Sequence, residues 1–129
     1  MTKEILSLEE IKLLVDTFYG WVRKDELLAP IFNNVIKDNW PAHLQKMYSF
    51  WQTVLLEEHT YSGAPFAPHA ALPIGKEHFD RWLLLFHATL DELFTGPKAE
   101  EARWRSNKMA EMFQYKLEYL KDRNLKSIL

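Results

Sequence analysis

The sequence of 129 residues lacks cysteine entirely. Disulfide bonds, a thiolate nucleophile and cysteine-ligated zinc or iron–sulfur sites are therefore excluded. An excess of one charge is also lacking: 16 Lys and Arg face 18 Asp and Glu, and a net charge of −2 argues against nucleic-acid binding. No apolar run reaches membrane-spanning length, and the N-terminus lacks the basic start and apolar stretch of a signal peptide. These absences predict a cytoplasmic protein that contacts neither nucleic acid nor membrane.

Aromatic side chains, in contrast, are abundant, with eight Phe, five Tyr and five Trp. A chain of this length is typical of one domain with one hydrophobic core. We find no repeat or linker, so residues 1–129 are predicted to form a single domain. The rings indicate either a dense aromatic core or a large, flat, apolar ligand. Composition leaves both interpretations open.

Hydrophobic periodicity predicts four helices and no strand, which is an all-α fold. The first helix begins with a capping box at Ser7 and Glu10 and ends near Asp25. The other three helices are expected at about residues 39–58, 76–95 and 98–121, with Gly96-Pro97 ending the third.

Two local features interrupt this pattern. Gly20 lies inside the first helix, where glycine costs about 1 kcal/mol relative to alanine, and a close helix crossing would explain its presence. The run from Glu26 to Phe32 is interpreted as a short turn that buries Phe32.

An irregular loop at residues 60–75 separates the second and third predicted helices. It holds three of the six prolines and two of the four glycines, with His69 at its centre. Loops of this length without secondary structure are uncommon in compact helical domains and are often functional. We therefore expect the chemistry of the protein to involve this loop.

The five histidines do not form a multi-histidine metal motif. No pair has the spacing of H-E-x-x-H, and the sequence has no phosphate-binding glycine loop and no nucleophile elbow. A single imidazole can be the axial ligand of a haem, which would be held non-covalently because cysteine is absent. His69 suits that role, although an exposed loop histidine is the ordinary alternative. His43 shares a helix face with Met47, Phe50 and Trp51 and is otherwise a partly buried core residue.

At these residues the sequence resembles the group III truncated haemoglobins. The similarity covers nearly the whole chain up to about Leu117, and the order and spacing of its fragments are specific. The chain has no Gly-Gly pair, which fits group III among the truncated groups. The matching fragments are Phe18-Tyr19, Val22 to Asp25, Pro30 to Asn34, Trp40 to His43, Phe50-Trp51, Leu55-Leu56, Tyr61 to Pro65, His69, Leu72-Pro73 and Arg81 to Leu83.

The resemblance implies a two-over-two helical sandwich around haem b. His69 matches the histidine that binds the iron, while Tyr19, Trp82 and His43 match the residues around the bound ligand. The other matching or positional candidates for haem contact are Phe32, Met47, Phe50, Trp51, Tyr61 and Arg81. Lys46 and Lys76 join Tyr61 and Arg81 as candidates for the haem propionates, on charge and position only.

The function implied by the resemblance is binding of dioxygen, NO, CO or peroxide at a five-coordinate iron. Hydrogen bonding around the ligand suits retention of oxygen or NO and peroxide chemistry better than oxygen transport. Turnover as an NO dioxygenase or a peroxidase-like enzyme would require a separate reductase. The alternative is a haem-free helical interaction domain in which the aromatic residues only build the core.

Overall fold

The computed structural model describes residues 1–128, and the side chains among them as far as Arg123. Every regular element in these residues is helical, apart from one isolated bridge between Lys3 and Phe94. The elements are α1 (Leu8–Val22), α2 (Ala29–Ile36), α3 (Trp40–Leu56), the 3₁₀ turn η1 (Ala67–His69), α4 (Lys76–Leu93) and α5 (Pro97–Ile128). The prediction of an all-α fold is confirmed.

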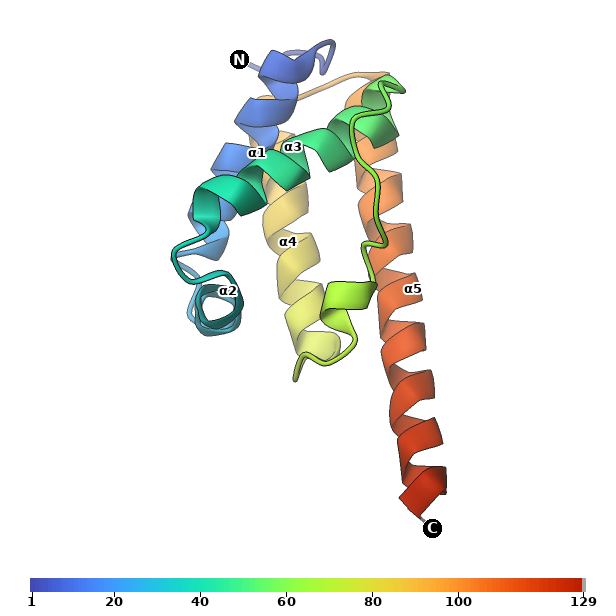
Figure 1. The fold of residues 1–129 in the computed structure, drawn as a ribbon. Helices are drawn as coiled ribbons and strands as arrows, with labels where there is room; N and C mark the ends of the chain where they lie inside the picture. Colours follow the sequence, from blue (N-terminus) through green and yellow to red (C-terminus); the bar gives the residue numbers. More distant parts are fainter. Residues whose placement is uncertain (129) are drawn as a thin grey trace.

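The four long helices form two pairs (Figure 1). α1 packs on α3 and α4 packs on α5, and contacts of α1 with α4 and of α3 with α5 join the pairs. This is the predicted two-over-two arrangement. The segment between α3 and α4 runs alongside α5 before it forms η1, so the loop that carries His69 lies against the helical body (Figure 1).

The start of α1 follows from local chemistry. The Glu10 carboxylate accepts hydrogen bonds from the backbone N–H of Ser7 at 2.9 Å and of Leu6 at 3.0 Å. These bonds satisfy donors that have no partner inside the helix. The predicted capping box is confirmed, and the buried face of the helix has the expected periodicity, comprising Ile11, Leu14, Val15, Phe18, Tyr19 and Val22.

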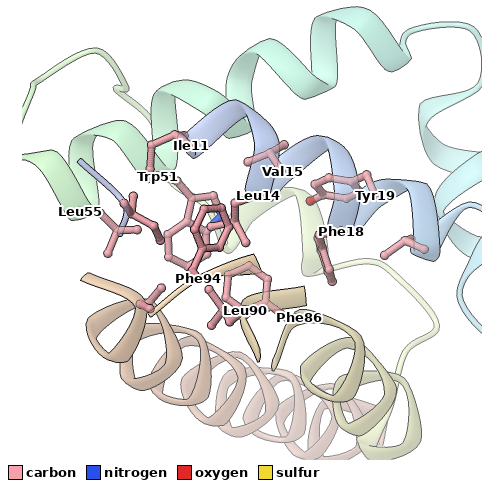
Figure 2. Packing of buried hydrophobic residues seen from close by; sticks show 14 of the residues in the cluster. Ile11, Leu14, Val15, Phe18, Tyr19, Trp51, Leu55, Phe86, Leu90 and Phe94 are labelled. Carbon is pink, nitrogen blue, oxygen red and sulfur yellow. The ribbon is translucent and has the colours of Figure 1, made fainter. Parts of the chain in front are cut away.

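Aromatic rings from three helices meet at Phe86 on α4 (Figure 2). Its ring is stacked on Trp51 of α3 at 5.1 Å between centroids and on Trp82 at 5.3 Å. Phe18 of α1 meets the same ring edge-to-face at 5.1 Å. Aromatic pairs of this kind add about 0.5–1.5 kcal/mol each beyond the area they bury. Part of the aromatic excess is therefore explained by a dense core.

The prediction of a short turn at residues 26–32 is wrong. The chain forms α2 from Ala29, with Pro30 in the first helical turn, where the missing N–H needs no partner. Phe32 is half-buried, and not buried as expected. A helix of eight residues is too short to show periodicity and depends on tertiary contacts, such as the edge-to-face contact of Phe32 with Tyr19 at 6.0 Å.

The loop after α3 is tied down by one hydroxyl group. The Thr53 side-chain oxygen accepts the backbone N–H groups of Thr60 at 3.1 Å and Tyr61 at 3.0 Å. The Thr53 hydroxyl in turn donates a hydrogen bond to the carbonyl oxygen of Ser49, with 2.8 Å between the two oxygens. These bonds hold the start of the loop against the last turns of α3.

α5 is longer than the sequence pattern predicted, since it continues to Ile128. Its lower half extends past the other helices (Figure 1). Among the residues that the structure describes, no helix is both long enough and apolar enough to cross a membrane.

The close helix crossing expected at Gly20 is absent, and this leads to a test of helix stability. A Cβ atom built on Gly20 meets no heavy atom within 4 Å. We expect Gly20→Ala to raise the free energy of unfolding by about 0.5–1 kcal/mol, since alanine loses less backbone entropy in a helix. Denaturant titration followed by circular dichroism measures this change.

The matched control is Gly96→Ala. Gly96 has φ +93°, and a Cβ there would lie 2.7 Å from a side-chain oxygen of Glu4, so this variant should lose stability. A loss of stability in Gly20→Ala as well would contradict the open position of Gly20 on α1.

Candidate functional site

His69 is held in one tautomer by the chain around it. Its Nδ1 lies 2.8 Å from the carbonyl oxygen of Pro65, which can only accept, so Nδ1 carries the proton and donates. Burial lowers the pKa of His69, although hydrogen bonds to Pro65 and Phe66 act in the other direction. The imidazole is therefore neutral near pH 7, with the lone pair on Nε2. This is the form that binds a metal ion.

His43 on α3 has a buried nitrogen without a partner. Among the described side chains, its Nε2 is the buried polar atom that makes no hydrogen bond. Burial lowers the pKa of His43, and the charges of Lys46 and His69 lower it further. An unsatisfied buried polar group costs about 1–3 kcal/mol and needs an explanation. A polar guest beside His43 would supply one.

Tyr19 lies beside His43. The two rings meet edge-to-face with centroids 5.2 Å apart, and Trp40 contacts both of them. Burial raises the pKa of Tyr19 above its usual value, so the hydroxyl keeps its proton throughout the physiological range. Tyr19 can therefore act as a hydrogen-bond donor next to the unpaired nitrogen of His43.

Trp82 is brought to the same region by α4. The ring of Phe18 contacts Tyr19 at 4.9 Å and Trp82 at 5.4 Å, so one phenylalanine positions both predicted donors. The stack on Phe86 fixes the plane of the indole, with only 2° between the two rings. The structure thus connects His43 and Trp82 to Tyr19, His43 by direct ring contact and Trp82 through Phe18.

The apolar candidates from α3 lie on the next turns of the same helix. Met47 and Phe50 are half-buried, whereas Trp51 is only 3% exposed. Phe50 contacts Trp51 at 5.2 Å on one side and Tyr61 at 5.4 Å on the other. Trp51 therefore belongs as much to the core as to a ligand site, and Tyr61 joins the loop to α3.

A largely apolar groove of about 790 Å³ lies between α3, the loop and α5. Phe50, Trp51, Phe66 and Phe113 are among the residues that line it. A volume of this order is in the range of cofactor and ligand sites. The ring of Phe113 also lies 5.0 Å from that of His69, so one residue of the groove contacts the predicted metal ligand.

Sequence reasoning missed Phe66 and Phe113 as site residues. Phe113 was visible only as a position on the apolar face of the last helix, where a core role is the ordinary interpretation. Phe66 was one more loop residue. Nothing in the sequence showed that η1 would place His69 against α5.

The cationic candidates differ in their surroundings. Arg81 forms an ion pair with Asp25 at 2.7 Å, and Lys76 pairs with Asp80 at 2.6 Å on the exposed face of α4. Lys46 is exposed, on the turn of α3 that follows His43, and its charge influences that histidine. The propionate role of these residues stays a prediction.

Comparison with known proteins supports the family that the sequence resembles. A profile of bacterial-like globins matches residues 4–115. The sequence is 36% identical over 118 residues to the group 3 truncated haemoglobin Ctb of Campylobacter jejuni, spanning 88% of this chain and 93% of that protein. The chain belongs to the group III truncated haemoglobins. The crystal structure of a group III truncated haemoglobin from C. jejuni matches this globin with a TM-score of 0.83, over 91% of this chain and 95% of that one.

The family confirms the resemblance and the fold, and it implies haem as the cofactor. The residues of this globin fit that group. His69 offers a neutral imidazole with its second nitrogen already bonded, and His43 presents a buried nitrogen without a partner. Phe113, which contacts His69, lines an apolar groove. Small gaseous ligands are the ligands that the family implies.

Asp25 supports this region, and its charge should make stability depend on pH. Burial raises the pKa of Asp25, but hydrogen bonds from Leu28, Arg81 and Leu27 outweigh burial, so the pKa lies below its usual value. The stabilisation is therefore present at neutral pH and is lost as the pH falls below the usual pKa of aspartate and through the lowered pKa of Asp25.

We expect Asp25→Asn to lower the free energy of unfolding by about 0.5–1 kcal/mol at pH 7, because Arg81 is partly exposed and the pair is screened. The difference from the wild type should shrink as the pH is lowered. Urea titrations at several pH values measure it, with Asp80→Asn as the control for an exposed pair. A difference that stays constant down to pH 2 would exclude the ionised form of Asp25 as the cause.

Proposed function

We propose that this globin holds haem b through His69 and retains a small ligand beside Tyr19, Trp82 and His43. The observation that carries the proposal is the unpaired, buried Nε2 of His43, whose ring contacts that of Tyr19. When bound, haem supplies an iron centre that takes dioxygen, NO, CO or peroxide and exchanges electrons.

His69 is prepared for the metal by its own loop. The bond from Nδ1 to the Pro65 carbonyl fixes the ring orientation and makes the free Nε2 more basic. The contact with Phe113 limits rotation of the ring from the other side. His69 therefore needs little reorganisation to act as the iron ligand.

Tyr19 and Trp82 are the donors for the ligand. The Tyr19 hydroxyl stays protonated because it is buried, and the indole N–H of Trp82 can only donate. A hydrogen bond to a ligand with partial negative charge is worth about 1.5–3 kcal/mol in such surroundings. Each donor should thus slow ligand release roughly tenfold or more. Slow release suits retention or turnover and not oxygen transport.

His43 completes the pocket on the α3 side. As a neutral imidazole it offers one donor and one acceptor, and its Nε2 can bond a ligand or a water molecule. We assign it control of entry to the pocket. NO dioxygenase or peroxidase-like turnover is compatible with this arrangement and would need electrons from a reductase.

The haem-free interaction domain is the weaker alternative. In such a domain the aromatic core would still form. The unpaired nitrogen of His43 would then lower stability with no ligand to form the missing hydrogen bond. Haem uptake separates the two interpretations directly.

The first test is haem ligation. We expect the purified wild type to show a strong Soret band that shifts on reduction and exposure to CO. His69→Gly should lose or shift that band, and added imidazole should restore it by replacing the missing side chain. His59→Gly, at an exposed position before the same loop, is the control and should keep the wild-type spectrum. A wild-type protein that takes up no stoichiometric haem would overturn the proposal.

The second test is hydrogen bonding to the ligand. Tyr19→Phe together with Trp82→Phe should raise the dissociation rate of dioxygen by at least about a hundredfold, because two donors are removed. Stopped-flow displacement of dioxygen by CO measures the rate. The control combines Tyr119→Phe with Trp21→Phe, whose side chains are 57% and 49% exposed. Equal rates in the two double variants would rule out Tyr19 and Trp82 as donors.

A further inference from the structure

Trp40 lies where three helices meet. It is the first residue of α3, and only 6% of its surface is exposed. The end of α1, the short helix α2 and the start of α3 gather at one corner of the fold (Figure 1). His43 follows in the first turns of the same helix, and its backbone N–H donates to the carbonyl oxygen of Asn39 at 2.9 Å. The position of His43 therefore depends on how the start of α3 is held.

Three rings form a closed triangle at this corner. The ring of Trp40 lies 5.8 Å from that of Tyr19 and 5.7 Å from that of His43, between centroids. The rings of Tyr19 and His43 are 5.2 Å apart, so each ring contacts the other two. All three contacts are edge-to-face, which is a preferred geometry of aromatic pairs. A displacement of Trp40 would therefore act on both residues of the ligand site.

The indole N–H of Trp40 is already used by α2. Its Nε1 donates to the side-chain oxygen of Asn33, with 3.2 Å between the two atoms. Tryptophan has one side-chain donor and no acceptor, so Trp40 has no hydrogen left for a bound ligand while this bond is in place. Any contribution of Trp40 to the site must come from the contacts of its ring.

The end of α1 holds the same indole by a second contact. The guanidinium group of Arg23 lies over the ring of Trp40, 4.6 Å from its centroid. A cation in this position is attracted by the π electrons of the ring. The hydrogen bond to Asn33 acts in the plane of the indole, and the cation acts across its face. The two contacts together restrict the ring in both directions.

The start of α3 needs these contacts because local chemistry does little to hold it. Asn39, at the cap position, makes no capping hydrogen bond through its side chain to any described residue, and Pro41 has no N–H. The connection from α2 includes Lys37 with φ +54°, which is uncommon for a residue with a Cβ atom. Asn33 bridges this connection, since its backbone carbonyl accepts the N–H of Lys37 at 2.9 Å and its side chain accepts that of Trp40.

We infer that Trp40 is a positioning residue, which keeps Tyr19 and His43 in the places from which they act on a bound ligand. Its own ring is kept in place by Asn33 and Arg23. The inference rests on the proposed function, in which Tyr19 is a donor to the ligand. A core residue needs only to fill its volume, whereas a positioning residue also needs the contacts that orient it. The bond to Asn33 therefore separates the two roles.

The first test follows the indole N–H itself, by NMR of the ferrous, CO-bound protein, which is diamagnetic. Asn33→Leu keeps a side chain of similar size but removes the acceptor. It should speed hydrogen exchange of the Trp40 indole roughly three- to tenfold, as expected for the loss of one hydrogen bond. Trp40→Phe identifies the resonance. Asn34→Leu, at the neighbouring exposed position of α2, is the matched control and should exchange like the wild type. Unchanged exchange in Asn33→Leu would overturn the inference.

The second test connects this bond to the ligand. Asn33→Leu should raise the dissociation rate of dioxygen roughly threefold or more and broaden the infrared band of bound CO, because the Tyr19 hydroxyl no longer keeps one position. Asn33→Asp retains an acceptor and should restore both properties, and Asn34→Leu should leave them unchanged. In a Tyr19→Phe background Asn33→Leu should lose most of its effect on release, since the donor that it displaces is gone.

The outcomes distinguish this inference from the proposed function. If Tyr19→Phe speeds release but Asn33→Leu does not, the positioning role of Trp40 is overturned and the proposed function stands. Equal effects of Asn33→Leu with and without the Tyr19 hydroxyl would also overturn it, since they would reflect general structural damage. Release at the wild-type rate from Tyr19→Phe would contradict the proposed function, and the inference with it.

Discussion

The contact of three aromatic rings with Phe86 is the interaction on which the rest of this globin depends. Trp51 comes from α3, Phe18 from α1, and Trp82 from the preceding turn of α4 itself. The ring of Phe86 thus fixes the relative positions of three helices. Phe18 then contacts Tyr19, so the same cluster that builds the core also sets the position of the two predicted hydrogen-bond donors. The same aromatic contacts therefore determine both the packing of the core and the geometry of the site.

Burial acts on the site in a uniform way, since it favours the neutral form of each titratable group. It raises the pKa of Tyr19 and lowers the pKa values of His43 and His69. The pocket therefore holds hydrogen-bonding groups without net charge, which an apolar macrocycle tolerates. Charged groups remain at the margin, where Asp25 and Arg81 connect the turn after α1 to α4.

The sequence allowed a good part of the fold to be predicted, for identifiable reasons. α1, α3 and α4 have apolar periodicity over many residues and recognisable ends, such as the Glu10 capping box and Gly96-Pro97. α2 was missed because eight residues around Pro30 carry too little pattern, and their helical state depends on the contact of Phe32 with Tyr19. Gly20 was misinterpreted because a sequence does not show which face of a helix stays open.

The sequence by itself determined the helical class, the isolation of His69 in a proline-rich loop, and the family. These properties reside in local spacing, in composition and in the order of short fragments. Three features were decided only by the tertiary structure. Phe113 contacts His69, the buried Nε2 of His43 makes no hydrogen bond with any described residue, and Arg81 forms an ion pair with Asp25. The contacts of Phe113 with His69 and of Arg81 with Asp25 join residues far apart in the chain. The buried nitrogen of His43 depends on the helices that pack around it. Contacts of this kind depend on how the helices pack, and local patterns in a sequence do not contain that information.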